Sequence, residues 1–314
     1  RNCNVADVTH IKKFVSIPVV CAGRMTPDTG AEKIAAGELD GAAFGRQFLA
    51  DPQWITKLKN DEEDEIRPCI CCHAGCFDLT KYEGSNNAQD LTDSLGMCRC
   101  AVNPQSMQSK HYKIVPAAHS KRVAVIGGGI GGMEAARVLK LRGHEPVIYE
   151  KSSVLGGVFI PAAAPDFKEQ DKALIQWFRH QTEELGIEVH LNTEIKDISS
   201  LKADAYIIAT GSVANKLKIP GSERAIDAVD YLNGAHTGND VVIIGGGLSG
   251  CEIAYDLYRH GKKPYIVEMK HDLMAVKNLC LANSSYLRDF FRTNHVPVFV
   301  DTSVEEIGED YVLV

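Results

Sequence analysis

Two glycine-rich turns have the residue types and spacing needed to bind the pyrophosphate of a dinucleotide. The first, at residues 127–132, follows a run of buried-strand residues and opens a helix pattern. Gly127 allows the tight turn, Gly129 lets the backbone approach the phosphates, and Gly132 lets the helix pack on the strand. The helix N-terminus presents free N–H groups to the phosphates. Glu150 ends the next predicted strand, where it can accept a hydrogen bond from a ribose hydroxyl.

The second turn repeats the first at one constant offset along the chain. Its glycines are Gly245, Gly247 and Gly250, and Glu268 takes the place of Glu150. Such an internal repeat indicates two nucleotide-binding halves, and so two dinucleotides. Each predicted helix ends at a glycine, where a left-handed C-terminal cap is favoured: Gly143 and Gly261.

A cluster of cysteines is the third feature with chemical potential. Cys69, Cys72 and Cys76 form a Cys-x2-Cys-x3-Cys pattern, and Cys98 and Cys100 follow later in the chain. Three close thiolates and one distant thiolate suit a cubane iron–sulfur cluster, in which each iron takes one cysteine. A zinc site with four sulfur ligands is the main alternative, and cysteines without a metal are the other.

Composition limits the remaining function classes. The chain has 314 residues, a formal net charge of -7 and ten cysteines. This mildly acidic balance argues against nucleic acid or a membrane surface as partner. No apolar run is long enough to span a bilayer and no signal region is visible, so we expect a cytoplasmic protein. The chain starts without Met, and we expect it to be part of a longer protein. The four cysteines outside the cluster are predicted to be small packed residues: Cys3, Cys21, Cys251 and Cys280.

The elements that position these groups follow an α/β pattern. Residues 1–66 show a βαβ rhythm, with strands at 17–20 and 41–44 around a helix near 31–36. Residues 67–118 hold six of the ten cysteines and little periodicity, so this segment needs a staple such as a metal centre. From Lys121 the strand, turn and helix patterns of the two repeats begin.

Residues 121–314 resemble the two-dinucleotide flavoprotein superfamily of glutathione-reductase-like fold, because Leu155-Gly156-Gly157 and Ala209-Thr210-Gly211 accompany the glycine turns. The resemblance implies FAD in the first unit and NAD(P)H in the second. Gly157, Thr210 and Gly211 then join the FAD site. Glu268 favours NADH over NADPH, since a carboxylate repels a 2′-phosphate, although Lys270 and His271 could soften the repulsion.

The order of motifs along the whole chain resembles the family of 2,4-dienoyl-CoA reductase, 2-enoate reductase and trimethylamine dehydrogenase, in its C-terminal part. This resemblance implies a [4Fe-4S] cluster on Cys69, Cys72, Cys76 and Cys100, because Cys100 begins Cys-Ala-Val-Asn-Pro. The chain departs from the family in two ways. Cys71 stands where the family usually has glycine. The stretch from Phe77 to Arg99 is longer than usual, so Cys98 competes with Cys100 as the fourth ligand.

The same resemblance implies that the chain starts at the end of an FMN-binding TIM barrel of the old yellow enzyme type. The last two barrel strands would be followed by the residues that face FMN: Gly23, Arg24, Gly45 and Arg46. The implied domains are a barrel end at 1–66, an iron–sulfur segment at 67–118, an FAD-binding domain at 119–215 and an NAD(P)H-binding domain at 216–314. The barrel, FAD and NAD(P)H domains would all be truncated.

The implied function is electron transfer from NADH through FAD and the cluster to FMN, and then to an activated carbon–carbon double bond in a small unsaturated substrate. Alternatives are an amine dehydrogenase of the trimethylamine dehydrogenase type and an inactive cofactor-binding scaffold. The fragment itself is expected to bind FAD weakly and to lack ene-reductase activity. The catalytic acid, the substrate and the oligomeric state do not follow from the sequence.

Overall fold

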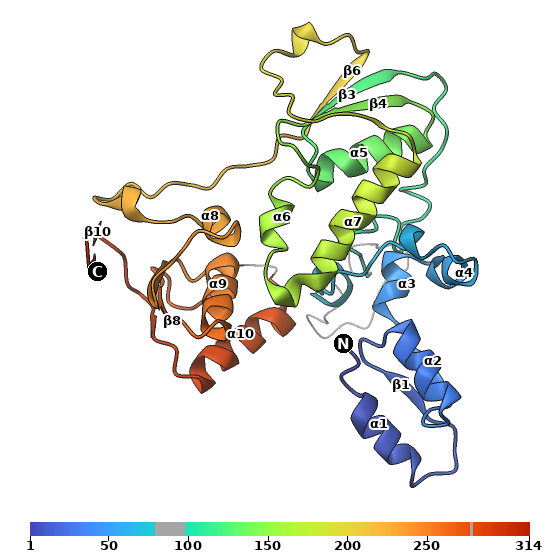
Figure 1. The fold of residues 1–314 in the computed structure, drawn as a ribbon, viewed down its shortest axis with the longest axis horizontal. Coiled ribbons are helices and arrows are strands. Elements are labelled where there is room, and N and C mark those ends of the chain that lie inside the picture. The colour runs from blue at the N-terminus through green and yellow to red at the C-terminus, as the bar shows by residue number, and fades with distance from the viewer. Residues whose placement is uncertain (79–97, 277–278) are drawn as a thin grey trace, which may run out of the picture. The chain divides into compact units, whose positions relative to one another are not determined.

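The computed structural model describes residues 1–78, 98–276 and 279–314. They divide into two compact units, Arg1–Cys69 and Ile70–Val314. The first unit is drawn in blue in Figure 1, and the second runs onward from there to red at the C-terminus. No helix in these three ranges is long and apolar enough to cross a membrane.

The first unit is built on two parallel strands, β1 (Val20–Ala22) and β2 (Gly41–Ala43), with α2 (Pro27–Ala35) between them in the chain. This is the predicted βαβ arrangement. Strand β1 begins later than predicted, and Pro18 in the predicted strand has no N–H to donate to a ladder. The other helices of this unit are α1 (Val5–Lys12), α3 (Arg46–Ala50) and α4 (Trp54–Lys59).

The small core of this unit contains Cys21, Met25 and Leu39. Thr26 caps the N-terminus of α2 with its side-chain oxygen, and Pro27 occupies the first helical position, where its missing N–H is harmless. A TIM barrel has eight strands, and residues 1–69 supply two. The barrel therefore stays a prediction.

The second unit contains the first glycine turn on a parallel four-stranded sheet of order β5-β4-β3-β6. Its helices α5 and α7 pack on one face of this sheet, around Val125, Met133, Ile148 and Leu174 (Figure 1). The strands are β3 (Arg122–Ile126), β4 (Glu145–Tyr149), β5 (Glu188–His190) and β6 (Ala205–Ile208), and the helices are α5 (Ile130–Leu141), α6 (Phe159–Ala162) and α7 (Glu169–Glu184).

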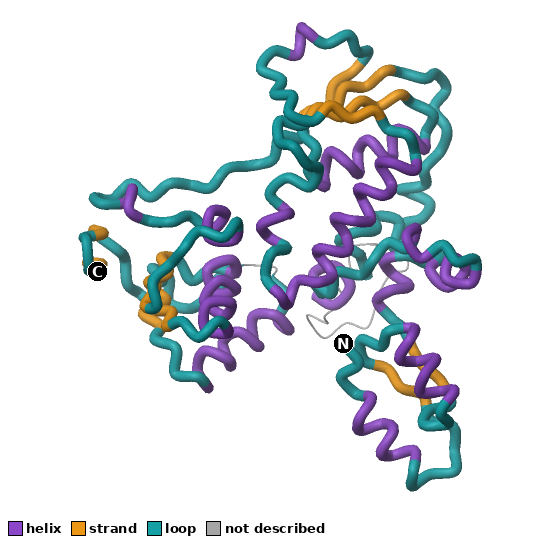
Figure 2. The backbone as a smooth tube through the Cα atoms, in the orientation of Figure 1, coloured by secondary structure: helices purple, strands orange, loops and turns teal. Residues whose placement is uncertain are grey.

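The second glycine turn lies on a parallel three-stranded sheet of order β7-β8-β9. Most of the chain between β6 and this sheet is loop (Figure 2). The core here joins Ile243 and Ile266 of the sheet to Leu257 and Phe291 of two helices. The elements are β7 (Asp240–Ile244), β8 (Lys263–Val267) and β9 (Val298–Phe299), with helices α8 (Ala228–Leu232), α9 (Leu248–Arg259) and α10 (Leu281–Thr293), and an antiparallel pair of β10 (Glu306–Ile307) with β11 (Val312–Leu313).

Both predicted helix stops are confirmed. Gly143 follows α5 with φ of +87° and Gly261 follows α9 with φ of +77°, so each has the left-handed conformation that glycine adopts without strain. An α/β fold with two Rossmann-like units is thus present in residues 121–314.

The predicted packing of the isolated cysteines is correct for three of them. Cys21 and Cys251 are fully buried and Cys280 is nearly so. The Sγ of Cys251 donates to the carbonyl oxygen of Gly246 at 3.3 Å, and burial raises the pKa of its thiol to about 12. The prediction is wrong for Cys3, which is exposed and whose Sγ donates to the Gly23 carbonyl oxygen at 3.3 Å instead of packing in a core.

Candidate functional site

The first glycine turn has a geometry that only glycine fits at two positions. Gly127 has φ of +108°, and a Cβ there would lie 2.2 Å from the carbonyl oxygen of Ala209. A Cβ on Gly132 would lie 1.9 Å from the carbonyl oxygen of Gly127. Gly129 is the residue before α5, so the first N–H groups of that helix face the turn. The turn can therefore hold a pyrophosphate as predicted for FAD.

Glu150 lies directly after β4 and is buried. Its Oε2 accepts from the backbone N–H of Gly128 at 2.6 Å, and its Oε1 accepts from the N–H and the hydroxyl of Ser152 at 2.7 and 2.8 Å. Burial alone would raise the pKa of Glu150, but these hydrogen bonds outweigh burial and hold the pKa below its ordinary value. An ionised carboxylate has about four acceptor sites, so one stays open for a ribose hydroxyl.

Three further residues predicted for FAD lie at the same edge of the sheet. Gly157 has φ of +55°, and its Cβ would approach the Cα of Gly129 to 3.1 Å, so this backbone passes close to the glycine turn. Thr210 and Gly211 follow β6, and the Cα of Thr210 lies 3.2 Å from the position of a Cβ on Gly127. The structure thus brings the predicted FAD residues together.

The second glycine turn reproduces the first. Gly245 has φ of +105°, and a Cβ on Gly250 would lie 2.0 Å from the carbonyl oxygen of Gly245. Gly247 precedes α9. Glu268 is buried after β8, where Oε2 accepts from the N–H of Gly246 at 2.6 Å and Oε1 from the N–H of Lys270 at 2.8 Å. The predicted NAD residues are therefore also together.

The repeat continues beyond the acid, which the sequence reading missed. The N–H of Gly156 donates to the carbonyl oxygen of Gly128 at 2.8 Å, and the N–H of Met274 donates to that of Gly246 at 2.7 Å. Leu155 and Leu273 approach the second glycine of their turns equally, with Cδ2 2.5 Å from a built Cβ. The sequence signal for this longer repeat is the leucine at the same offset from both turns. It is easily overlooked because Gly156 follows Leu155, whereas Met274 follows Leu273.

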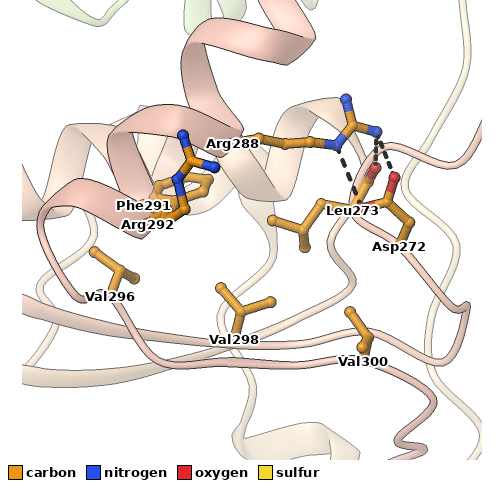
Figure 3. A pocket seen from close by; sticks show the side chains of 8 residues that line it. All are labelled: Asp272, Leu273, Arg288, Phe291, Arg292, Val296, Val298 and Val300. Atoms are coloured by element: carbon orange, nitrogen blue, oxygen red, sulfur yellow. Dashed lines mark hydrogen bonds and ion pairs between the residues drawn. The ribbon is translucent and has the colours of Figure 1, made fainter.

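Beyond Glu268, an open hollow of about 350 Å³ lies between α10 and β9 (Figure 3). Arg288 donates from Nη2 to Oδ2 of Asp272 at 2.9 Å and to the carbonyl oxygen of Leu273 at 2.5 Å. This arginine therefore ties the loop after Glu268 to α10. The hollow contains none of the glycine-turn residues, and its walls are Asp272, Leu273, Arg288, Phe291, Arg292, Val296, Val298 and Val300.

The cysteine loop folds against the segment that carries the distant cysteines. The N–H of Arg99 donates to the carbonyl oxygen of Gly75 at 3.0 Å. A Cβ on Gly75 would lie 2.7 Å from the carbonyl oxygen of Arg99, so a side chain there would separate the two segments. Cys76 and Cys100 are adjacent in sequence to this contact. The residues on either side of Cys72 both have left-handed backbone angles, with φ of +56° at Cys71 and +58° at His73.

Burial raises the pKa of the Cys72 thiol, and a negative charge on Cys100 would raise it further. Among residues 1–78, 98–276 and 279–314, no group of three or more His, Cys, Asp or Glu side chains is arranged to hold a metal ion. Of the four predicted ligands, Cys69 belongs to the first compact unit and the other three belong to the second. The iron–sulfur cluster stays a prediction.

The residues predicted for FMN follow the two parallel strands of the first unit. Gly23 and Arg24 follow β1 with φ of +122° and +51°, and Gly45 and Arg46 follow β2, where Arg46 begins α3. The carboxyl ends of parallel neighbours lie at one edge of a sheet. The two arginines therefore follow the same edge, and the FMN site stays a prediction.

The chain matches the family model for pyridine nucleotide-disulphide oxidoreductases over residues 98–201 and 121–313. It is 37% identical over 309 residues to a cinnamate reductase of Clostridium sporogenes, covering 96% of this chain and 45% of that protein. It is 38% identical over 275 residues to an NADH oxidase of Thermoanaerobacter brockii, covering 84% of this chain and 41% of that protein.

A solved structure of 2-naphthoyl-CoA reductase with 2-naphthoyl-CoA aligns with a TM-score of 0.86 and 27% identity, over 99% of this chain and 46% of that one. This chain spans less than half the length of these relatives. The family match covers both glycine turns and indicates FAD and NAD(P)H binding. The chain thus belongs to the pyridine nucleotide-disulphide oxidoreductases, in the group that includes 2,4-dienoyl-CoA reductase and trimethylamine dehydrogenase.

Proposed function

We propose that this chain acts in an NADH-dependent flavin reductase of activated carbon–carbon double bonds. The observation that carries the proposal is the pair of glycine turns, each closed by a buried acid that accepts from the turn's own backbone at 2.6 Å. Two such turns in one chain can hold a pyridine nucleotide and a flavin dinucleotide. Hydride transfer between these cofactors is the chemistry that they share.

The chain's own residues bind and orient the cofactors in this proposal. The N-termini of α5 and α9 hold the two pyrophosphates, and Glu150 and Glu268 accept from the riboses. When bound, the cofactors supply hydride and single-electron transfer in the order NADH, FAD, iron–sulfur cluster and FMN. The cluster would be held by Cys69, Cys72, Cys76 and Cys100, and FMN by Gly23, Arg24, Gly45 and Arg46.

NADH is the proposed donor because Glu268 lies where its carboxylate can accept from a ribose hydroxyl. Arg288, which could otherwise bind a 2′-phosphate, donates instead to Asp272 and Leu273. A 2′-phosphate would meet the carboxylate of Glu268, whereas a 2′-hydroxyl can donate to it. An amine dehydrogenase would not need the second turn for NADH. The intact turn and its acid therefore favour the reductase.

The proposed substrate class is an enoate, enoyl-CoA or enone. Two relatives are named for reduction of cinnamate and of 2-naphthoyl-CoA, in which unsaturation is conjugated to a carbonyl group. Such conjugation lets the carbonyl oxygen take up the charge that forms when hydride adds to carbon, and that charge is what an active site stabilises.

The first test is anaerobic mixing of the FAD-saturated chain with NADH or with NADPH, followed by flavin absorbance. We expect bleaching with NADH and slower bleaching with NADPH. A chain that holds FAD and binds NADH without bleaching contradicts the proposed electron entry. Faster reduction by NADPH contradicts the choice of donor.

The second test concerns the cysteine loop. Anaerobically prepared protein should contain about four irons per chain. Replacement of Cys72 by Ala should remove the iron, whereas the matched Cys71→Ala change should keep it. Stoichiometric zinc without iron would contradict the cluster and leave the FAD and NADH sites untouched.

A further inference from the structure

A contact between the two dinucleotide-binding units runs along one face of α9. The face is formed by Glu252, Tyr255 and Arg259, which are spaced by one helical turn each. The carboxylate of Glu252 accepts from Nζ of Lys168 at 2.8 Å. Lys168 lies immediately before α7 of the FAD-binding unit, so this ion pair joins the start of α7 to α9 of the other unit.

The aromatic part of this contact is Phe167. Its ring packs edge to face on Tyr255, with centroids 5.2 Å apart. The guanidinium of Arg259 lies 6.0 Å from the Phe167 ring and 5.7 Å from the Tyr255 ring. Phe167 thus contributes both an aromatic pair and a cation–π contact to this surface.

The internal repeat allows the same position to be compared in the helices that follow the two glycine turns. Glu134 stands in α5 where Glu252 stands in α9. Its carboxylate accepts from Nε and Nη2 of Arg137, within its own helix, at 2.7 and 3.0 Å. Glu252 thus pairs with a residue of the other unit, and this pair of Glu134 lies within its own helix.

Both ends of the contact are close in the chain to a phosphate-binding turn. Glu252 lies about one helical turn after Gly247, where α9 begins. On the other side, the chain runs from Gly157 through the short helix α6 to Phe167 and Lys168. The side chains of Lys168 and Glu252 are only 22% and 27% exposed, so water screens the ion pair incompletely.

We propose that Lys168 and Glu252, together with Phe167, form a joint that sets the orientation of the NAD(P)H-binding unit on the FAD-binding unit. They are positioning residues: they act by holding α9, and not by contact with a reacting atom. Hydride transfer requires the nicotinamide and the flavin to approach in one geometry, and a small misplacement costs up to about 10²-fold in rate. The kinetic part of this inference rests on the proposed function, whereas the joint itself does not.

The kinetic experiment uses the full chain saturated with FAD and mixed anaerobically with NADH at increasing concentrations. Lys168→Gln and Glu252→Gln should each lower the limiting rate of flavin reduction by about 10-fold. The dissociation constant of NADH should change by less than about 3-fold, because the turn and Glu268 are intact. Lys168→Glu and Glu252→Lys, each made alone, should also lower the rate. The double variant that combines them restores opposite charges and should recover most of that loss.

The control is Arg122→Ala, which removes an ion pair with Glu188 at the opposite end of β3 from the glycine turn. It should leave the rate unchanged. The FAD content and the thermal unfolding temperature of every variant show whether a lower reduction rate is caused by misfolding. A rate that is unchanged in both Gln variants, or a double variant that recovers nothing, would overturn the joint.

Hydrogen exchange separates a failure of this inference from a failure of the proposed function. Peptides covering residues 163–169 and 248–259 should exchange faster in Lys168→Gln than in the native chain, and as in the native chain in Arg122→Ala. If native protein with bound FAD is not reduced by NADH, the proposed function fails and exchange alone decides about the joint. Exchange that is unchanged in Lys168→Gln would refute it.

Discussion

The two dinucleotide-binding units share one turn but stand in different surroundings. Each turn has a first glycine with φ near +105°, at +108° and +105°. In the FAD-binding unit β6 pairs with β3, so the carbonyl of Ala209 lies beside Gly127. Within the described parts of the chain, β7 pairs with β8 alone, and a Cβ on Gly245 would meet nothing within 4 Å. Among the described residues, Gly127 is thus constrained by its backbone angle and by Ala209, and Gly245 is constrained by its backbone angle.

The units also differ in how the loop after the acid returns to the turn. Gly156 and Gly157 both have positive φ, and Gly157 packs on Gly129. In the other unit Met274 makes the matching hydrogen bond and Ala275 follows. The FAD-binding unit therefore brings a second stretch of bare backbone to its turn, and the NAD(P)H-binding unit does not.

The largest expected effect comes from a methyl group at the third glycine of each turn. Gly132→Ala and Gly250→Ala would each press a Cβ to about 2 Å from a backbone carbonyl oxygen, and the cost should be about 3 kcal/mol or more. Gly132→Ala should abolish FAD binding, whereas Gly250→Ala should abolish NADH binding and retain FAD. Flavin content and NADH titration measure the two losses. Loss of both cofactors in both variants would show that the units do not act separately.

Substitution of the first glycine should separate the two surroundings. Gly245→Ala should lower the free energy of unfolding only through its positive φ, by an amount of order 1–3 kcal/mol. Gly127→Ala meets a similar penalty and also the carbonyl oxygen of Ala209 at 2.2 Å, which adds about 1–3 kcal/mol. Chemical unfolding of the two variants should therefore differ by at least about 1 kcal/mol. Equal costs would mean that β6 shifts without a measurable penalty and that Ala209 does not constrain Gly127.

Removal of each buried acid should weaken only its own cofactor. Glu268→Ala should weaken NADH binding by about 1–3 kcal/mol, the scale of a lost hydrogen bond to a charged group. FAD affinity should stay as in the native chain. Glu150→Ala should do the reverse, which makes it the matched control. Titrations of both ligands against both variants test the pattern, and a crossed effect would argue against separate sites.

The smallest expected effect is a pH dependence of FAD binding that comes from Glu150. The pKa of Glu150 in the folded chain lies below its ordinary value of 4.5. Its contribution to stability is therefore complete above pH 4.5 and is lost as the pH falls through the lower folded pKa. Acid titration of FAD release should show this loss, and Glu150→Gln should flatten it. An unchanged acid profile in Glu150→Gln would assign the loss to other carboxylates.

Local chemistry explains what could be predicted from the sequence. The glycine turns, the acids at the ends of β4 and β8, and the helix stops at Gly143 and Gly261 all depend on a few neighbouring residues. Backbone angles that only glycine adopts without strain, and unpaired N–H groups at a helix start, are encoded within a single turn of chain. For that reason most predicted strands and the residues around both turns lie where they were expected.

Only the tertiary structure decided which distant residues meet. Phe167 with Tyr255, Arg288 with Asp272, and Arg99 with Gly75 are separated in the sequence, and each residue alone is unremarkable there. Their approach depends on strand order and on how helices pack over the sheets. The sequence by itself therefore determined two dinucleotide-binding turns, because each turn is self-contained. The folded chain decided the joint between them and the neighbour that makes Gly127 more constrained than Gly245, because such contacts exist only after the sheets have formed.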